Sequence, residues 1–136
     1  CLRHDPPFIG TVALFYYEPP MTRLILDLKF NQNLAHARVL GELLAEKIQR
    51  QGYPLPKMII PVPLHPQRLK ERGFNQAIEI ARPVARALNL PLDIESCQRI
   101  RHTAAQATLS SSERLQNIKH AFHVTRNLNQ QAIAIV

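Results

Sequence analysis

The chain has 136 residues, of which 46% are hydrophobic and 20% are charged, as is typical of one soluble globular domain. Its apolar runs are far shorter than the roughly 20 residues of a membrane-spanning helix, so we expect no membrane span. With 17 Lys and Arg against 10 Asp and Glu, the formal net charge is +7, which predicts affinity for nucleic acids, nucleotides or phosphate compounds. Two cysteines are too few for a disulfide scaffold and favour a cytoplasmic location.

The first half of the chain predicts two helices between two strands. Residues 9–17 are rich in β-branched and aromatic types and predict a strand that a pair of prolines ends. Residues 21–30 and 33–50 repeat apolar side chains at helical spacing, and the second run lies between a capping Asn and a stopping Gly. Residues 57–63 form an apolar run bounded by prolines, which is typical of a strand buried in a parallel sheet.

The second half continues the alternation of helices and strands. In chain order it predicts a helix, a strand, an aperiodic loop, a helix opened by a capping box and two more strands: 75–88, 92–97, 99–109, 110–120, 121–125 and 132–136. We therefore predict an α/β domain with a mostly parallel sheet flanked by helices. In such sheets, ligands bind beyond the C-terminal ends of the strands.

A basic segment joins the strand predicted at 57–63 to the helix predicted at 75–88. It holds four potential cations, a permissive glycine and the start of a helix: Leu64, His65, Arg68, Lys70, Arg72, Gly73, Asn75 and Gln76. Clustered cations beside the free N–H groups of a helix start make an anion site. A solvated connection without a ligand explains the same charges equally well, because basic loops are common.

A second basic segment follows the strand predicted at 92–97. Its candidate binding residues are Arg99, Arg101, Thr103, Gln106, Arg114 and Lys119. A long aperiodic loop is uncommon in a compact domain unless it serves as a lid or a binding loop. The alternative is a surface excursion with no ligand, and the segment alone does not decide between them.

Four motifs resemble those of the ComF family, the competence-protein-F-like or DNA-utilisation-like members of the type I phosphoribosyltransferase superfamily. They are PVPLH at 61–65, RGFNQA at 72–77, R-x-R-x-T-x-x-Q at 99–106 and R-x-x-N-I-x-x-A-F at 114–122. The resemblance implies a phosphoribosyltransferase-like domain over residues 9–136. It also implies binding of phosphoribosyl pyrophosphate with Mg²⁺ and a role in competence, DNA uptake or DNA utilisation.

The same resemblance implies roles for the two basic segments. Residues 64–72 would form the diphosphate loop, and Arg99, Arg101 and Lys119 would belong to a mobile loop that closes over the diphosphate. The remaining alternative is a non-catalytic module that binds single-stranded DNA or a partner protein through its basic surface.

The ends of the sequence depart from the family pattern. The family's phosphate-binding fingerprint follows a strand like the one at 132–136, but this sequence stops at Val136, so we expect a C-terminally incomplete domain that is inactive as a transferase on its own. Residues 1–8 are expected to be a linker, the possible remnant of a zinc ribbon. Cys1 alone cannot form a four-ligand zinc site, so we predict no metal there.

Overall fold

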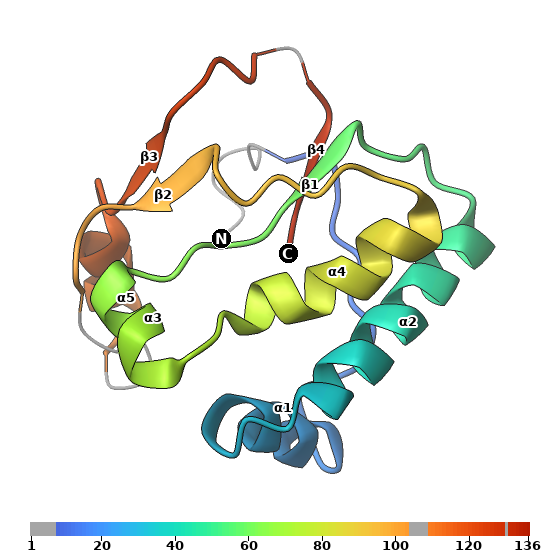
Figure 1. Cartoon of the computed structure of the whole chain (residues 1–136), viewed down its shortest axis with the longest axis horizontal. Coiled ribbons are helices and arrows are strands. Elements are labelled where there is room, and N and C mark those ends of the chain that lie inside the picture. The colour runs from blue at the N-terminus through green and yellow to red at the C-terminus, as the bar shows by residue number, and fades with distance from the viewer. Residues whose placement is uncertain (1–7, 104–108, 130) are drawn as a thin grey trace.

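The computed structural model describes residues 8–103, 109–129 and 131–136. In chain order their elements are α1 (Met21–Phe30), α2 (Leu34–Gln51), β1 (Met58–Ile60), α3 (Pro66–Arg72), α4 (Gln76–Leu88), β2 (Cys97–Arg99), α5 (Ser111–Ile118), β3 (Phe122–Val124) and β4 (Ile133–Ile135). Figure 1 shows α2 and α4 side by side against β1 and β4, with α3, α5, β2 and β3 at the other end of the molecule. The fold is mixed α/β, as the alternation of elements predicts.

The predicted start signals of α4 and α5 are present in the structure, whereas Asn33, predicted to cap α2, makes no side-chain bond to the helix start. The side-chain oxygen of Asn75 accepts a hydrogen bond of 2.9 Å from the backbone N–H of Ala77 and so starts α4. Gly52, with φ of +64°, ends α2 in the left-handed conformation that glycine adopts without strain. The carboxylate of Glu113 accepts from the backbone N–H of Ser110 at 2.8 Å, which confirms the predicted capping box of α5.

Glycine and proline together let α2 and α4 pack closely. A β-carbon added to Gly41 of α2 would lie 2.5 Å from the carbonyl oxygen of Ile80 and would also overlap the ring of Pro83, both in α4. Such an approach is shorter than any van der Waals contact, so only glycine fits there. Pro83 lies inside α4, and the helix continues through it to Leu88.

The parallel sheet consists of β1 and β4, with Met58, Ile59 and Ile60 opposite Ile133, Ala134 and Ile135. Leu92 adds an isolated parallel bridge on the other side of Ile59. Against this sheet lies a buried cluster drawn from α2, β1 and α4, whose members are Ala45, Ile59, Ala81, Val84, Ala85 and Leu88. The parallel prediction is confirmed for β1 and β4, whereas β2 and β3 form a separate antiparallel pair.

One predicted strand, 9–17, is wrong, and another, 92–97, is interrupted by a turn between Leu92, which pairs with Ile59, and Cys97, where β2 begins. Residues 9–17 form no strand, because no described segment pairs with them, and their side chains are largely exposed. The chain at 92–97 bends instead of extending, since Asp93 Oδ1 accepts hydrogen bonds from the backbone N–H groups of both Glu95 and Ser96, each at 3.0 Å. The strand therefore starts later, at Cys97.

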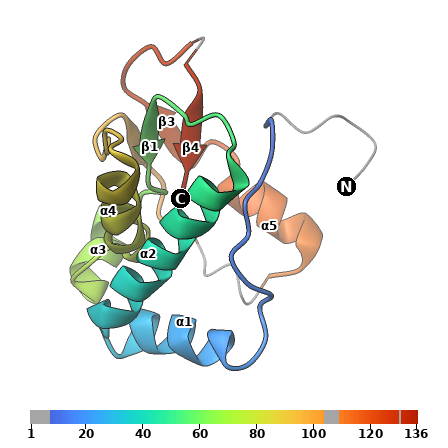
Figure 2. The same cartoon turned by 90° about the vertical axis from the view of Figure 1, so that its right-hand side faces the viewer.

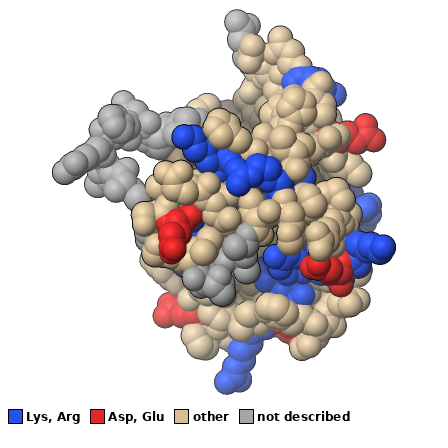
Figure 3. All heavy atoms as spheres, turned by 90° about the vertical axis from the view of Figure 1, so that its left-hand side faces the viewer, with Lys and Arg blue, Asp and Glu red and all other residues tan. Residues whose placement is uncertain are grey.

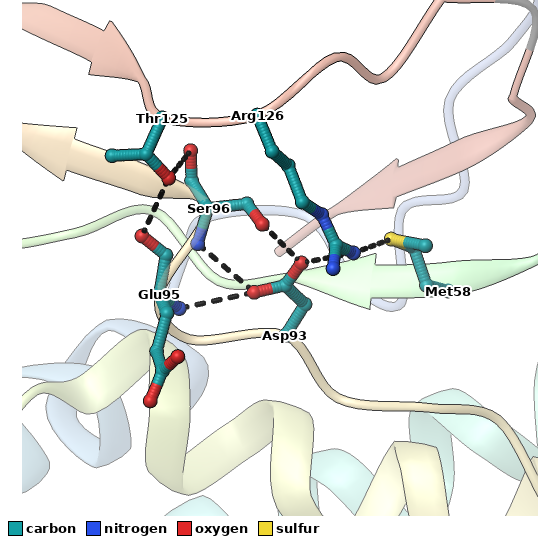
Figure 4. A network of polar contacts seen from close by, with 6 residues as sticks. All are labelled: Met58, Asp93, Glu95, Ser96, Thr125 and Arg126. Carbon is teal, nitrogen blue, oxygen red and sulfur yellow. Dashed lines mark hydrogen bonds and ion pairs between the residues drawn. The ribbon is translucent and has the colours of Figure 1, made fainter.

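Asp93 is the centre of a polar network that joins three parts of the fold (Figure 4). Its Oδ2 also accepts from the Ser96 hydroxyl at 2.6 Å and lies 2.6 Å from Nη2 of Arg126. Arg126 in turn contacts the sulfur of Met58 in β1 at 3.4 Å. The network thus ties the chain beyond β3 to the turn before β2 and to the parallel sheet.

Candidate functional site

An open groove of about 380 Å³ lies beyond the C-terminal end of β1. Its walls come from the chain after β1, the starts of α3 and α4, and the chain around β2. The lining residues are Pro61, Pro63, Leu64, His65, Pro66, Leu69, Asn75, Ile78, Ile94, Cys97, Gln98, Arg99 and Ile100. This is the edge of a parallel sheet at which the sequence predicts a ligand site.

Residues 64–72, predicted as a loop, contain the helix α3. Pro66 occupies its first turn, where a missing N–H costs nothing, and Gly73 ends it with φ of +82°. His65 caps the helix, because its Nδ1 accepts from the backbone N–H of Gln67 at 3.3 Å. This contact uses Nδ1 of His65 within the fold.

Arg99 lies at the end of β2 and lines the groove. Its Nη2 donates to the hydroxyl of Thr103, which is buried, and its guanidinium carbon lies 5.6 Å from the ring centroid of Phe122. Burial lowers the pKa of Arg99 below its ordinary value, and the charge of Arg68 lowers it further. The Nε of Arg99 is buried and has no hydrogen-bond partner within the described ranges.

The structure brings the two basic segments together. The imidazole rings of His65 and His102 have centroids 5.1 Å apart at an angle of 56°. Arg68 of α3 is close enough to Arg99 for the two positive charges to repel. Residues from two distant parts of the sequence therefore meet at the groove, as expected if both segments serve one ligand.

Other predicted residues of the first segment have structural roles. Asn75 is 5% exposed, caps α4 and donates to the carbonyl of Val62 at 3.0 Å, so both ends of its amide are used within the fold. Arg72 donates to the Gln76 side chain at 2.8 Å and lies outside the groove lining. Lys70 is exposed on α3 and also lies outside the lining.

The second segment is likewise only partly at the groove. Arg101 donates to the backbone carbonyl of Lys119, which follows α5, and Arg114 donates to the carbonyl of Leu109 at 3.0 Å. These contacts hold the second segment to itself rather than to the groove. Gln106 lies outside the described residues.

Sequence reasoning missed two residues of this region. Cys97 lines the groove, where burial raises the pKa of its thiol, so the thiol stays protonated. Phe122 supports Arg99 from the facing strand. Phe122 could have been predicted only from its position opposite Arg99, and the sequence does not give the register that pairs these two residues.

Basic side chains also spread beyond the groove. Figure 3 faces the end of the molecule that carries α3, β2 and β3, and Lys and Arg side chains run across the middle of this face, with Asp and Glu at separate places around them.

None of the helices within the described ranges has the length and apolar character of a membrane span.

Curated proteins from several bacteria are similar to the chain. The DNA utilization protein YhgH of Escherichia coli strain K12 is 35% identical over 140 residues, covering 100% of this chain and 62% of that protein. The protein of the same name from Salmonella typhi is 36% identical over 128 residues, covering 91% of this chain and 56% of that protein. Competence protein F of Haemophilus influenzae is 33% identical over 134 residues, covering 96% of this chain and 58% of that protein.

The chain thus spans 56% to 62% of the length of these relatives. Their names and their similarity support a ComF-like family. No protein-family model and no solved structure matches the chain.

Proposed function

We propose that this ComF-like chain binds the diphosphate of phosphoribosyl pyrophosphate in the groove beyond β1 and serves competence or DNA utilisation, the processes named in its relatives. The observation that carries the proposal is the meeting of two basic segments beside one groove. His65 of the first segment and Arg99 of the second line the groove, and Arg68 and His102 lie next to them without being part of its lining. The proposal keeps the cytoplasmic location that the low cysteine content favours.

The charges at the groove suit an anion with more than one charged group. Arg99 is partly desolvated and repelled by Arg68, and the only carboxylate that pairs with either of them in the described residues is that of Glu71, 4.0 Å from Arg68, so a bound anion would further offset their charge. A diphosphate carries negative oxygens on two linked phosphates and can contact both Arg68 and Arg99. His65 also lines the groove, and its Nδ1 caps α3.

These cations also suit the chemistry of phosphoribosyl transfer. When the bond between ribose and diphosphate breaks, negative charge builds up on the leaving diphosphate. Fixed guanidinium groups stabilise such charge without having to reorganise at the moment of reaction. We therefore assign Arg68 and Arg99 to binding and charge neutralisation.

Mg²⁺ would accompany the ligand rather than bind to the groove alone. Mg²⁺ prefers carboxylate and phosphate oxygens, and it is often held by substrate phosphates. Among the residues that the structure describes, no group of three or more His, Cys, Asp or Glu side chains could hold a metal ion. The described lining of the groove is largely apolar, with Arg99 as its one Lys or Arg and no carboxylate, so it does not by itself suit Mg²⁺.

Calorimetric titration of the purified protein with phosphoribosyl pyrophosphate and Mg²⁺, and separately with inorganic pyrophosphate, tests the proposal. We expect Arg68→Ala and Arg99→Ala each to weaken pyrophosphate binding by roughly tenfold or more, because each removes a charge-assisted hydrogen bond. Arg50→Ala is the control, since Arg50 is 78% exposed and pairs with Glu46 on α2. Equal affinities for all four proteins would contradict the proposal.

A second candidate is a non-catalytic module that binds single-stranded DNA through the basic surface. The formal net charge of +7 and the names of the relatives favour it. Binding to DNA phosphates releases counterions, so the affinity should fall steeply with salt, with a slope of roughly 0.7 per contacted phosphate on logarithmic axes.

The two candidates differ in what Arg50→Ala and Arg99→Ala do. A DNA surface of spread charge loses a similar, small part of its affinity in each variant. If the ligand instead binds in the diphosphate groove, only Arg99→Ala of these two variants should lower the affinity. Fluorescence anisotropy of a labelled single strand, measured on both variants over a range of salt, separates them.

A further inference from the structure

Phe122 faces the cation that the groove depends on. The register of β2 and β3 places Phe122 directly opposite Arg99, and the Arg99 guanidinium lies over the Phe122 ring at 5.6 Å from its centroid. Thr103 accepts from Nη2 of the same guanidinium. One side of the group is thus held by a ring face and one edge by a hydroxyl.

This support matters because Arg99 is held under unfavourable conditions. Its Nε is buried without a hydrogen-bond partner within the described ranges, and Arg68 repels it. A long, flexible side chain under these conditions gains conformational entropy and hydration when it moves into solvent. An aromatic ring face attracts a guanidinium, and more strongly so when the pair is partly desolvated.

Hydrophobic packing does not account for this position of Phe122. The ring is 38% exposed, β3 is exposed along its length, and Phe122 is not part of the buried cluster of α2, β1 and α4. Its specific neighbour is the charged group, for which a ring face and an aliphatic side chain are not equivalent.

We propose that Phe122 is a positioning residue for anion binding: its ring fixes the Arg99 guanidinium at the groove so that Arg68 and Arg99 present a prearranged pair of cations. The proposal rests on the proposed function of the groove. Prearrangement raises affinity because binding then no longer has to order the Arg99 side chain. Phe122 itself does not line the groove.

The first test is calorimetric titration with inorganic pyrophosphate. We expect Phe122→Leu to weaken binding about fivefold, the size of one cation–π contact, and Phe122→Tyr to restore the wild-type affinity because it keeps the ring face. Phe30→Leu makes the same substitution on α1, which lies far from β3 in both Figure 1 and Figure 2, and should leave affinity unchanged. Thermal unfolding of each variant checks that it is folded.

A spectroscopic test follows the contact itself. The chain has no Trp, so Phe122→Trp introduces a single indole beside Arg99. We expect pyrophosphate to change the emission of this indole in the Phe122→Trp protein and to leave it unchanged when Arg99→Ala is added.

The outcomes separate the inference from the proposed function. If the wild type binds pyrophosphate and Phe122→Leu binds it equally well, the positioning role of Phe122 is wrong and the groove proposal stands. If Phe122→Tyr is as weak as Phe122→Leu, the ring face is not the cause and the inference fails. If the wild type does not bind pyrophosphate, the proposed function itself fails.

Discussion

Asp93 and Arg126 form an ion pair, with Oδ2 2.6 Å from Nη2, that fastens the chain beyond β3 to the turn before β2. The Ser96 hydroxyl holds the pKa of Asp93 below its ordinary value of 3.8, and the backbone N–H groups of Ser96 and Glu95 and the charge of Arg126 add to this effect. Because β2 carries Arg99 to the groove, this pair supports the site from outside it.

We predict an acid-dependent loss of stability at Asp93. In the unfolded chain Asp93 takes up its proton near pH 3.8, whereas in the native protein it stays ionised to lower pH. Its stabilising effect is therefore complete above pH 3.8 and is lost as the pH falls through the lowered native pKa. Urea unfolding from neutral to acid pH should show a steeper loss in the wild type than in Asp93→Asn.

The control for this prediction is Glu95→Gln. Glu95 is exposed, and Figure 4 shows its carboxylate pointing away from Asp93. At neutral pH we expect Asp93→Asn to lower the free energy of unfolding by about 1–3 kcal/mol, because it weakens the hydrogen bonds from Ser96 and removes the ion pair with Arg126, and Glu95→Gln to leave it nearly unchanged. Identical pH profiles for Asp93→Asn and the wild type would contradict the assignment.

A second prediction concerns the cap of α4. Asn75→Ala removes both the bond to Ala77 N–H and the bond to the Val62 carbonyl, so we expect a loss of about 2–3 kcal/mol in the free energy of unfolding. Asn75→Asp keeps the accepting oxygen and should lose less. Asn33→Ala is the comparison, since Asn33 precedes α2 without a side-chain cap bond and its amide donates to Asp27 at 3.0 Å. An Asn75→Ala loss no larger than that of Asn33→Ala would count against this cap.

A third prediction concerns the crossing of α2 and α4. Gly41→Ala should destabilise the protein by about 1–3 kcal/mol through overpacking against Ile80 and Pro83. Adding Pro83→Ala should recover part of the loss, because it removes the ring but leaves the Ile80 carbonyl in place. Gly10→Ala should have little effect, since nothing lies within 4 Å of its added β-carbon. Chemical denaturation of the single and double variants measures the coupling.

A fourth prediction concerns ligand charge. Arg99 in the groove and Arg68 next to it should favour inorganic pyrophosphate over inorganic phosphate by roughly tenfold or more, because we expect only the longer anion to reach both guanidinium groups. Arg68→Ala should narrow this ratio. Shifts in melting temperature over matched ligand concentrations give both affinities. Equal affinity for the two anions would show that the cations do not act together.

Local sequence signals predicted the helices well and the strands less well. The periods of α2, α4 and α5 and the start signals of α4 and α5 lie within each helix and its flanking residues, so the sequence alone reveals them. The predicted cap of α2 is wrong, because the Asn33 side chain bonds to Asp27 rather than to the helix start. A strand exists only with a partner, which is why the aromatic run at 9–17 was predicted wrongly. The helix α3 was missed because its basic residues suggested a loop, although Pro66 in the first turn is a helix-start signal.

The candidate site was predictable in its parts and not in its assembly. His65, Arg68 and Arg99 were all named from the sequence. Their meeting at one groove depends on how α3 and the pair of β2 and β3 pack, which no local pattern encodes. Asn75 and Arg72 were also predicted as ligand contacts; Asn75 lines the groove while its amide bonds within the fold, and Arg72 Nη1 donates to Gln76.

The groove has walls of unequal rigidity. The wall after β1 rests on the buried cluster, whereas the wall that carries Arg99 belongs to β2, and neither β2 nor β3 supplies a residue to that cluster. Segments with few buried contacts open at lower free energy than the core, so the amide hydrogens of β2 and β3 should exchange with solvent before those of α2 and α4. An anion that contacts both walls would then slow hydrogen exchange most in β2 and β3. Ligand binding should therefore protect the amide hydrogens of these strands more than those of the helices.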